Sequence, residues 1–310
     1  FASGDSESIT AKSRLSHRGN GFLNGLRVWP AIWRNESSFG NLLRTLQQHP
    51  RVVSELALFD EFKHWAPSRP LDQVRDDLVV LERRLGTARD AGLAAGINVI
   101  STVGHGIHQI EDVMAHPPMV NHRGDASLAV ACPRSESLRR YLADYYRLMA
   151  QTKPNLIWVD DDFRTVAGGV RYGCFCDRCL RAFGFEGSRE DLVGRLEGQG
   201  GFEWRKRWGN FFAEAMEEVL VLIRQTVRAV DPEIELGLMT VGYSLSTYAG
   251  YPIGDWMRKL GAERGRPGQG FYNDDEPRAL IDKAMEVGRQ VHDYPESVTL
   301  AQYELENWPY

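Results

Sequence analysis

The sequence predicts an α/β fold built on a parallel sheet. Short apolar runs of strand length alternate along the chain with segments in which apolar residues recur at helical spacing, a pattern typical of repeated βα units. Seven such steps follow one another without a change in composition, and 310 residues are enough for one large barrel. No G-x-G-x-x-G motif follows a predicted strand, which weakens a dinucleotide-binding sheet as the alternative. We therefore expect a (β/α)8 barrel (TIM barrel) over residues 26–310, preceded by an arm over residues 1–25.

The first half of the chain supplies four of the expected strands. Residues 1–25 are mainly polar, which is why they are assigned to an arm. Apolar runs predict strands at 26–33, 53–59, 97–103 and 156–159. The last of these runs, Leu-Ile-Trp-Val, has no alternation, which is typical of a strand buried on both faces. Amphipathic spacing predicts helices at 39–49, 71–95 and 135–150, with Ser135 or Ser137 as the N-cap of the third.

The second half continues the same alternation. Helical spacing predicts helices at 204–230, 253–260 and 277–292. Strands are expected at 235–241, 268–272 and 298–305. An eighth strand is not evident, so either the chain is a fragment of a longer protein or one strand has escaped the count.

Composition excludes several classes of function. The net charge is −5 and the pI is about 6.0, so nothing points to a nucleic-acid or membrane surface. No apolar run approaches the length of a membrane span. Eight Trp and eleven Tyr suit a carbohydrate cleft, although they suit any large core as well. Neither a nucleic acid nor a membrane is expected as a partner, and a homo-oligomer is an open alternative.

Polar residues gather directly after several predicted strands. They are Asp60 and Glu61, His105 and His108, Asp160 to Asp162, Tyr272 to Asp275, and Glu304 to Glu306. In a (β/α)8 barrel, the C-terminal ends of the strands form the face that carries the active site. The pattern therefore predicts one shared site at this face.

Three consecutive aspartates end the strand at 156–159. Strand alternation puts Asp160 and Asp162 on one face with Trp158, and Asp161 on the other. Acidic groups resist burial unless they are paired or used. The alternative is an exposed acidic loop or a helix N-cap.

The strand at 298–305 offers a second set of acids. Glu304 and Glu306 lie on one face if the strand stays regular. A frayed, exposed terminus is the alternative. Facing Asp162 across the barrel mouth, one of these glutamates would complete the two-carboxyl arrangement that glycoside hydrolysis uses.

The four cysteines have the spacing of a metal site. Cys174, Cys176 and Cys179 form C-x-C-x-x-C, and Cys132 lies upstream. Four thiolates can close a tetrahedral zinc site, which would be structural because no ligand position is left for water. Two disulfides and ordinary reduced thiols are the alternatives. Cysteines of the zinc type favour the cytoplasm, but the chain starts at Phe1, so a signal peptide removed upstream, and secretion with it, stays open.

On these residues the chain resembles glycoside hydrolases of the barrel clan GH-A, and most of all the family 42 β-galactosidases. That family has W-Q-x-D-N-E-Y at its fourth strand, and Trp158, Asp160 to Asp162 and Phe163 are similar. It also binds zinc through one cysteine followed by C-x-C-x-x-C. The family's E-x-x-P pattern at the seventh strand corresponds to Glu306 to Pro309. The resemblance implies a retaining glycosidase with Asp162 as acid/base, Glu306 as nucleophile, Glu304 as the reserve nucleophile and a structural zinc.

The departures from the family bear on mechanism. Asp162 stands where the family has Glu, which shortens the side chain by roughly 1.5 Å. The backbone could move in to compensate, or the gap between the carboxyl groups could widen from about 5 Å toward the roughly 6.5–9.5 Å of inverting enzymes. Asp161 stands where the family has Asn, so the choice of sugar is open as well.

The remaining candidates are assigned to substrate binding. Aromatic side chains that could stack on a sugar, each of which could equally belong to the core, are Trp29, Trp33, Tyr272 and Trp308. Side chains that could bind hydroxyl groups are Asp60, Glu61, His105, His108, Asp160, Asp161 and Arg164. Two other functions stay open: a metal-dependent hydrolase using Asp160, Asp162 and a histidine, and a carbohydrate-binding barrel without catalysis.

Overall fold

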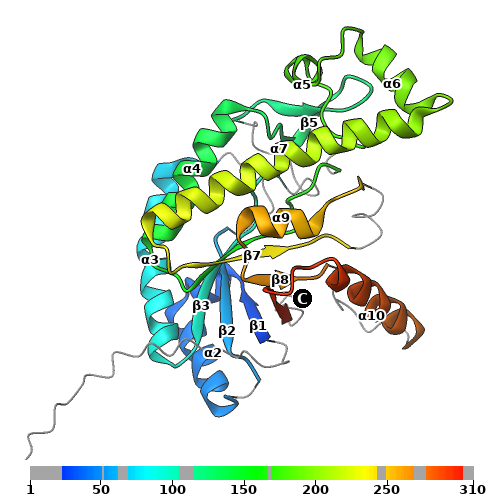
Figure 1. Ribbon diagram of the computed structural model, residues 1–310. Helices are drawn as coiled ribbons and strands as arrows, with labels where there is room; N and C mark the ends of the chain where they lie inside the picture. Colours follow the sequence, from blue (N-terminus) through cyan, green and yellow to red (C-terminus); the bar gives the residue numbers. More distant parts are fainter. Residues whose placement is uncertain are drawn as a thin grey trace, which may run out of the picture.

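The computed structural model describes residues 23–50, 52–61, 69–104, 115–166, 169–242, 249–268 and 277–302. Within these residues, seven parallel strands form a closed barrel (Figure 1). In ring order they are β1 (Leu23–Val28), β2 (Glu55–Phe59), β3 (Ala94–Val99), β6 (Leu156–Val159), β7 (Glu235–Met239), β8 (Arg264–Arg266) and β9 (Thr299–Gln302). The parallel α/β barrel expected from the sequence is confirmed.

The ring is closed by its first and last strands. β1 pairs with β2 on one side and with β9 on the other, where Leu23 is in register with Ala301. All the ladder pairs around the ring are parallel, so the C-terminal ends of the strands meet at one rim.

Helices cover the outside of the barrel. They are α1 (Pro30–Trp33), α2 (Glu36–Gln48), α3 (Leu71–Asp90), α4 (Glu136–Gln151), α7 (Gly201–Val230), α9 (Ile253–Leu260) and α10 (Pro277–His292). Alternate strand residues such as Leu56, Ile97 and Ile157 point outward and pack under these helices in one large core. None of the described helices is both long enough and apolar enough to serve as a membrane span.

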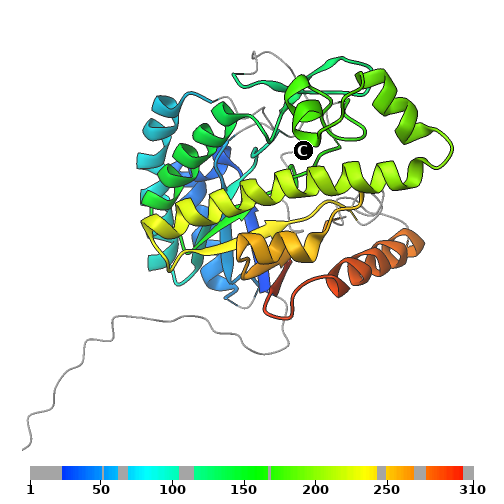
Figure 2. The same ribbon diagram turned by 45° about the horizontal axis from the view of Figure 1, so that its top comes forward.

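Two stretches of the chain, one between β3 and α4 and one between β6 and α7, together build an insertion beside the barrel. It contains the antiparallel pair β4 (Pro118–Val120) and β5 (Ala126–Ala131), and the helices α5 (Asp177–Phe183) and α6 (Arg189–Glu197). Figures 1 and 2 show the insertion standing at the N-terminal half of α7, which runs on past the barrel to reach it. β4 and β5 both precede Cys132, which follows directly after β5.

Other predicted boundaries also differ from the observed ones. The expected strand 26–33 ends early because Pro30, whose fixed φ suits a first helical turn, begins α1. The helix expected at 71–95 ends at Asp90, and Ala94 already belongs to β3. The prediction of a strand at 268–272 is wrong for Gly268, which is not part of a strand. The sixth barrel strand is β8, which lies upstream of it. The predicted bounds of β6, α9 and α10 are confirmed.

The barrel interior has an apolar middle. Ala57, Leu156, Trp158 and Met239 form a small buried cluster there. Gly237 on β7 leaves room for the indole, because a Cβ at that position would lie 2.4 Å from the Trp158 ring. Polar groups occupy the barrel interior on both sides of this apolar cluster, and those toward the C-terminal rim form the candidate site.

Candidate active site

Asp160 lies inside the barrel and is neutralised there. Its Oδ2 accepts a hydrogen bond of 2.7 Å from the Asn98 amide and lies 3.6 Å from Nη1 of Arg27. Arg27 also covers the ring of Phe59. The ion pair joins β1 to the end of β6, and the hydrogen bond joins β3 to the same carboxylate, so the two buried contacts connect three strands.

Asp162 binds the backbone that follows β3. Its Oδ2 accepts hydrogen bonds from the backbone N–H groups of Thr102, Val103 and Gly104, at 2.6, 2.9 and 3.0 Å. The side chain is fully buried. Gly104 has φ of +120°, and a Cβ there would lie 1.9 Å from the Ala129 carbonyl oxygen, so the turn that presents these donors depends on glycine.

Asp161 is the most accessible of the three aspartates. Its side chain is 20% exposed, and it lies 3.5 Å from Arg266 and 3.8 Å from Arg164. The expected strand alternation stops at Asp160, because the chain turns there and Phe163 N–H bonds back to the Asp160 carbonyl oxygen. Asp161 therefore reaches toward β8 and does not point away from the barrel.

Asp60 and Glu61, after β2, share the hydroxyl of Tyr145 on α4. The Tyr145 oxygen lies 2.6 Å from Asp60 and 3.1 Å from Glu61. Burial raises the pKa of both carboxyl groups, and the charge of Asp60 raises the pKa of Glu61 further. A tyrosine hydroxyl has one hydrogen. If Asp60 accepts it, a protonated Glu61 can donate to the same oxygen, in agreement with its raised pKa.

The other predicted residues fall into two groups. Trp33 is fully buried and donates its indole N–H to the Phe59 carbonyl oxygen, so it belongs to the core and cannot stack on a sugar. Trp29 is also buried and stacks on Phe59 with ring centroids 4.4 Å apart. His105, His108, Tyr272, Glu304, Glu306 and Trp308 lie outside the described residues.

Several polar residues of this site were not predicted. Arg27 and Asn98 each interrupt an apolar strand run, and that interruption was the available signal for a polar barrel interior. Tyr145 sits at an ordinary buried position of an amphipathic helix. Arg266 lies in the charged strand Arg-Gly-Arg, which gives no apolar signal at all.

The four cysteines come together in the insertion. Their sulfur atoms all lie within 4.8 Å of one another, and Cys132 Sγ is 3.5 Å from Cys179 and 4.0 Å from Cys176. All four are free thiols, which disagrees with the disulfide alternative. A tetrahedral zinc with Zn–S bonds of about 2.3 Å puts its sulfurs roughly 3.8 Å apart. The cluster therefore fits a four-thiolate metal site.

The chain was compared with known proteins. No family model matches it, and no curated protein does either. Among solved structures, a β-galactosidase from Bacillus circulans sp. alkalophilus superposes with a TM-score of 0.54 at 14% identity, covering 86% of this chain and 42% of its own. The catalytic domain of a β-amylase from Paenibacillus polymyxa superposes with a TM-score of 0.58 at 11% identity, covering 93% and 86%.

A third similar structure is the β-galactosidase from Rahnella sp. R3, with a TM-score of 0.53 at 11% identity, covering 84% of this chain and 41% of its own. At these identities the likeness shows the fold alone. The fold is thus a barrel of the kind found in glycoside hydrolases, and this chain spans less than half the length of the two β-galactosidases.

Proposed function

We propose that this chain is a glycoside hydrolase that removes terminal sugars of the β-galactoside type by a two-carboxyl, retaining mechanism. The observation that carries the proposal is the group of carboxyl side chains at the rim where β2 and β6 end. Active sites of such barrels lie at this rim. The similar solved structures named β-galactosidase and β-amylase support the same class of reaction.

Glu306 is proposed as the nucleophile, with Glu304 as the reserve. Both follow β9 in sequence, and β9 runs parallel to the strands that end in the other carboxyl groups. In the retaining mechanism, a carboxylate attacks the anomeric carbon while a carboxylic acid protonates the leaving oxygen, and that second group then deprotonates water.

Asp161 is proposed as the carboxylate of β6 that contacts the sugar. It is partly exposed, and two guanidinium groups favour its ionised form, in which it can accept hydrogen bonds from hydroxyl groups. Asp162, the acid expected from the sequence motif, is fully buried on three backbone N–H groups. These contacts favour a positioning role, in which Asp162 fixes the loop after β3.

The two candidates for the proton donor are Asp162 and Glu61. A general acid has to be protonated near neutral pH and has to reach the leaving oxygen. Burial and the charge of Asp60 raise the pKa of Glu61, which satisfies the first condition. Loss of the acid should slow substrates with a poor leaving group far more than substrates with an activated one. Comparing Asp162→Asn and Glu61→Gln on a dinitrophenyl and an alkyl glycoside therefore identifies it.

The cysteine cluster is proposed to hold a structural zinc ion. Cys132, Cys174, Cys176 and Cys179 would supply all four ligands. Zinc bound in this way would hold the insertion together, and the chemistry would stay with the carboxyl groups.

The test of the function is hydrolysis of chromogenic glycosides by the purified chain. We expect release of the chromophore from at least one β-glycoside, loss of turnover in Glu306→Gln, and an unchanged circular dichroism spectrum. Full activity in Glu306→Gln would refute the assignment of the nucleophile.

A further inference from the structure

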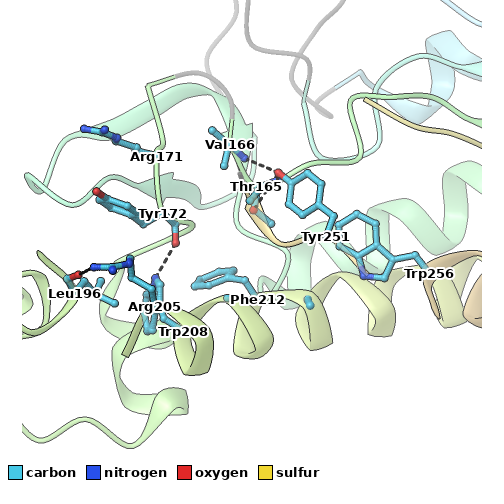
Figure 3. Close-up of a pocket in the computed structure, with 13 residues that line it drawn as sticks. Thr165, Val166, Arg171, Tyr172, Leu196, Arg205, Trp208, Phe212, Tyr251 and Trp256 are labelled. Carbon is cyan, nitrogen blue, oxygen red and sulfur yellow. Dashed lines mark hydrogen bonds between the residues drawn. The ribbon is translucent and has the colours of Figure 1, made fainter. Parts of the chain in front are cut away.

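A pocket of about 440 Å³ lies between the insertion, α7 and α9 (Figure 3). That volume is within the range of small-molecule sites, which run from about 300 to 1,000 Å³. Arg171, Tyr172 and Arg205 stand at one end, and Tyr251 and Trp256 at the other (Figure 3). Phe212 of α7 lies between them.

The pocket is connected to the candidate active site through one loop. The hydroxyl oxygen of Tyr251 accepts hydrogen bonds from the backbone N–H groups of Thr165 and Val166, at 2.7 and 3.2 Å. Thr165 is four residues from Asp161, so the two are at most about 14 Å apart along an extended backbone. One oligosaccharide could therefore touch both.

The pocket wall combines positive charge with aromatic surface. Arg171 and Arg205 bring two guanidinium groups, and none of the described lining residues is Asp or Glu. A guanidinium matches a carboxylate in shape and charge. The rings of Tyr172 and Tyr251 are half-buried, and each already contacts one pocket residue: Arg171 lies over the Tyr172 ring at 5.5 Å, and Trp256 packs on Tyr251 with ring centroids 4.9 Å apart. The wall at both ends is therefore built of rings and guanidinium groups packed together.

Trp256 adds a hydrogen-bond donor that has no acceptor. The residue is 1% exposed, and within the described part of the chain its indole N–H has no partner. Phe163 and Tyr251 pack against its ring, with centroids 5.3 and 4.9 Å away, so the indole is held in place. The nitrogen itself is covered by protein atoms, so a ligand in the pocket would pack against the fixed ring and would not reach this donor.

We propose that this pocket binds a sugar unit that carries a carboxylate, a uronate, within the carbohydrate substrate. The inference rests on the proposed glycosidase function and gives the substrate class. The carboxylate would lie at the arginine end, and ring or hydroxyl oxygens at the Trp256 end. The pocket thereby selects an acidic glycan beside the bond that is cleaved.

Binding is measured without catalysis, by quenching of tryptophan fluorescence. The intact chain is titrated with glucuronate and galacturonate, and in parallel with glucose and galactose. We expect saturable quenching by at least one uronate, at least tenfold weaker binding of the matching neutral sugar, and weakening of uronate binding by added salt. Equal affinity for the acidic and neutral sugars, or no saturable response to either uronate, would overturn the proposal.

Arg171→Gln tests the pocket directly, since Arg171 is exposed and its loss should leave the fold intact. The matched control is Arg178→Gln, an exposed arginine of α5 that does not line the pocket. We expect uronate affinity to fall about tenfold in the first variant and to stay unchanged in the second. Equal affinities in the two variants would contradict the site. Uronate binding without glycoside hydrolysis would refute only the proposed function, and hydrolysis of neutral glycosides without uronate binding would refute only this site.

Discussion

Asp160, Asp161 and Asp162 are neighbours in sequence, but each has a different environment at the end of β6. Asp160 is paired with Arg27 inside the barrel, Asp162 binds three backbone N–H groups, and Asp161 reaches the rim between two arginines. The turn at Asp160 separates them, because it breaks the strand alternation. Identical side chains can therefore be assigned different tasks.

Substitution separates the positioning and substrate-contacting roles. Asp162→Ala leaves three backbone N–H groups without their acceptor, and hydrogen bonds to a charged group contribute about 1.5–3 kcal/mol each. We expect the free energy of unfolding to fall by at least about 3 kcal/mol in urea titrations. Asp161→Ala should lower it by less than Asp162→Ala does and reduce turnover at least tenfold, because the substrate contact is lost. An Asp162→Ala variant as stable as the parent, or an Asp161→Ala variant with full turnover, would contradict this division.

Glu55 at the opposite end of the barrel responds to pH. Burial raises its pKa from 4.5 to about 7, and the charge of Glu235 adds to this, while Arg264 and Trp158 oppose it. Arg264 lies 2.8 Å from Glu235 and 4.0 Å from Glu55, so one cation faces two carboxyl groups. The folded state therefore holds a proton on Glu55 that the unfolded chain releases above pH 4.5.

Stability should consequently fall as pH rises from about 4.5 to about 7. Because each pKa unit corresponds to about 1.4 kcal/mol, Glu55 costs on the order of 3 kcal/mol above this window. Glu55→Gln removes the titrating group. Between pH 5 and pH 8, the free energy of unfolding should therefore fall less in this variant than in the parent. The control is Glu203→Gln, an exposed position on α7. The prediction fails if the Glu55→Gln and parent curves are parallel across this pH range.

The insertion depends on contacts among short elements. β5 leads to Cys132, the segment before α5 carries Cys174 and Cys176, and α5 itself carries Cys179. Val120 of β4 donates its N–H to the Cys174 sulfur at 3.3 Å. A metal at this point would join the hairpin to α5, two elements too small to be stable alone.

Metal content tests that account. We expect about one zinc ion per chain by elemental analysis, and none after Cys176→Ser, since a four-thiolate site needs all its ligands. The variant should unfold the insertion at a lower temperature while the barrel keeps its far-ultraviolet circular dichroism. Ser37→Ala, at an exposed position of α2 and outside the insertion, serves as a control. Purified protein without metal, and with an unchanged melting curve after Cys176→Ser, would rule out the structural zinc.

Apolar periodicity was enough to predict most of the barrel elements and failed where local chemistry overrides it. β6, α9 and α10 were predicted to the residue because their apolar spacing is clear. β8 was missed because its inward side chains are arginines that bind carboxylates inside the barrel.

The candidate site was predictable in location but not in detail. Carboxyl groups after β2 and β6 could be read from the sequence, since parallel strands end at one rim. The burial of Asp162 could not be predicted from the sequence, because it depends on three backbone N–H groups some 60 residues away along the chain. The partnership of Asp60 and Glu61 with Tyr145 depends likewise on tertiary contact.

The whole barrel brings these parts to one rim. The ring order is β2, β3, β6, so one strand separates Asp60 and Glu61, which follow β2, from the three aspartates, which follow β6. The three solved structures named above share only 11–14% of their residues with this chain, which shows how little of the sequence the architecture requires. Function on such a fold depends on the residues at the rim.

Hydrolysis of a panel of chromogenic α- and β-glycosides, including uronides, tests the central claim most directly. Glu306→Gln, with Glu304→Gln as the matched neighbour, is measured in the same assay. We expect turnover of at least one β-glycoside, a loss of at least about 1,000-fold in Glu306→Gln, and a much smaller loss in Glu304→Gln. No turnover of any glycoside by folded protein, or equal turnover in the parent and Glu306→Gln, would contradict the assignment of this barrel as a glycosidase with Glu306 as its nucleophile.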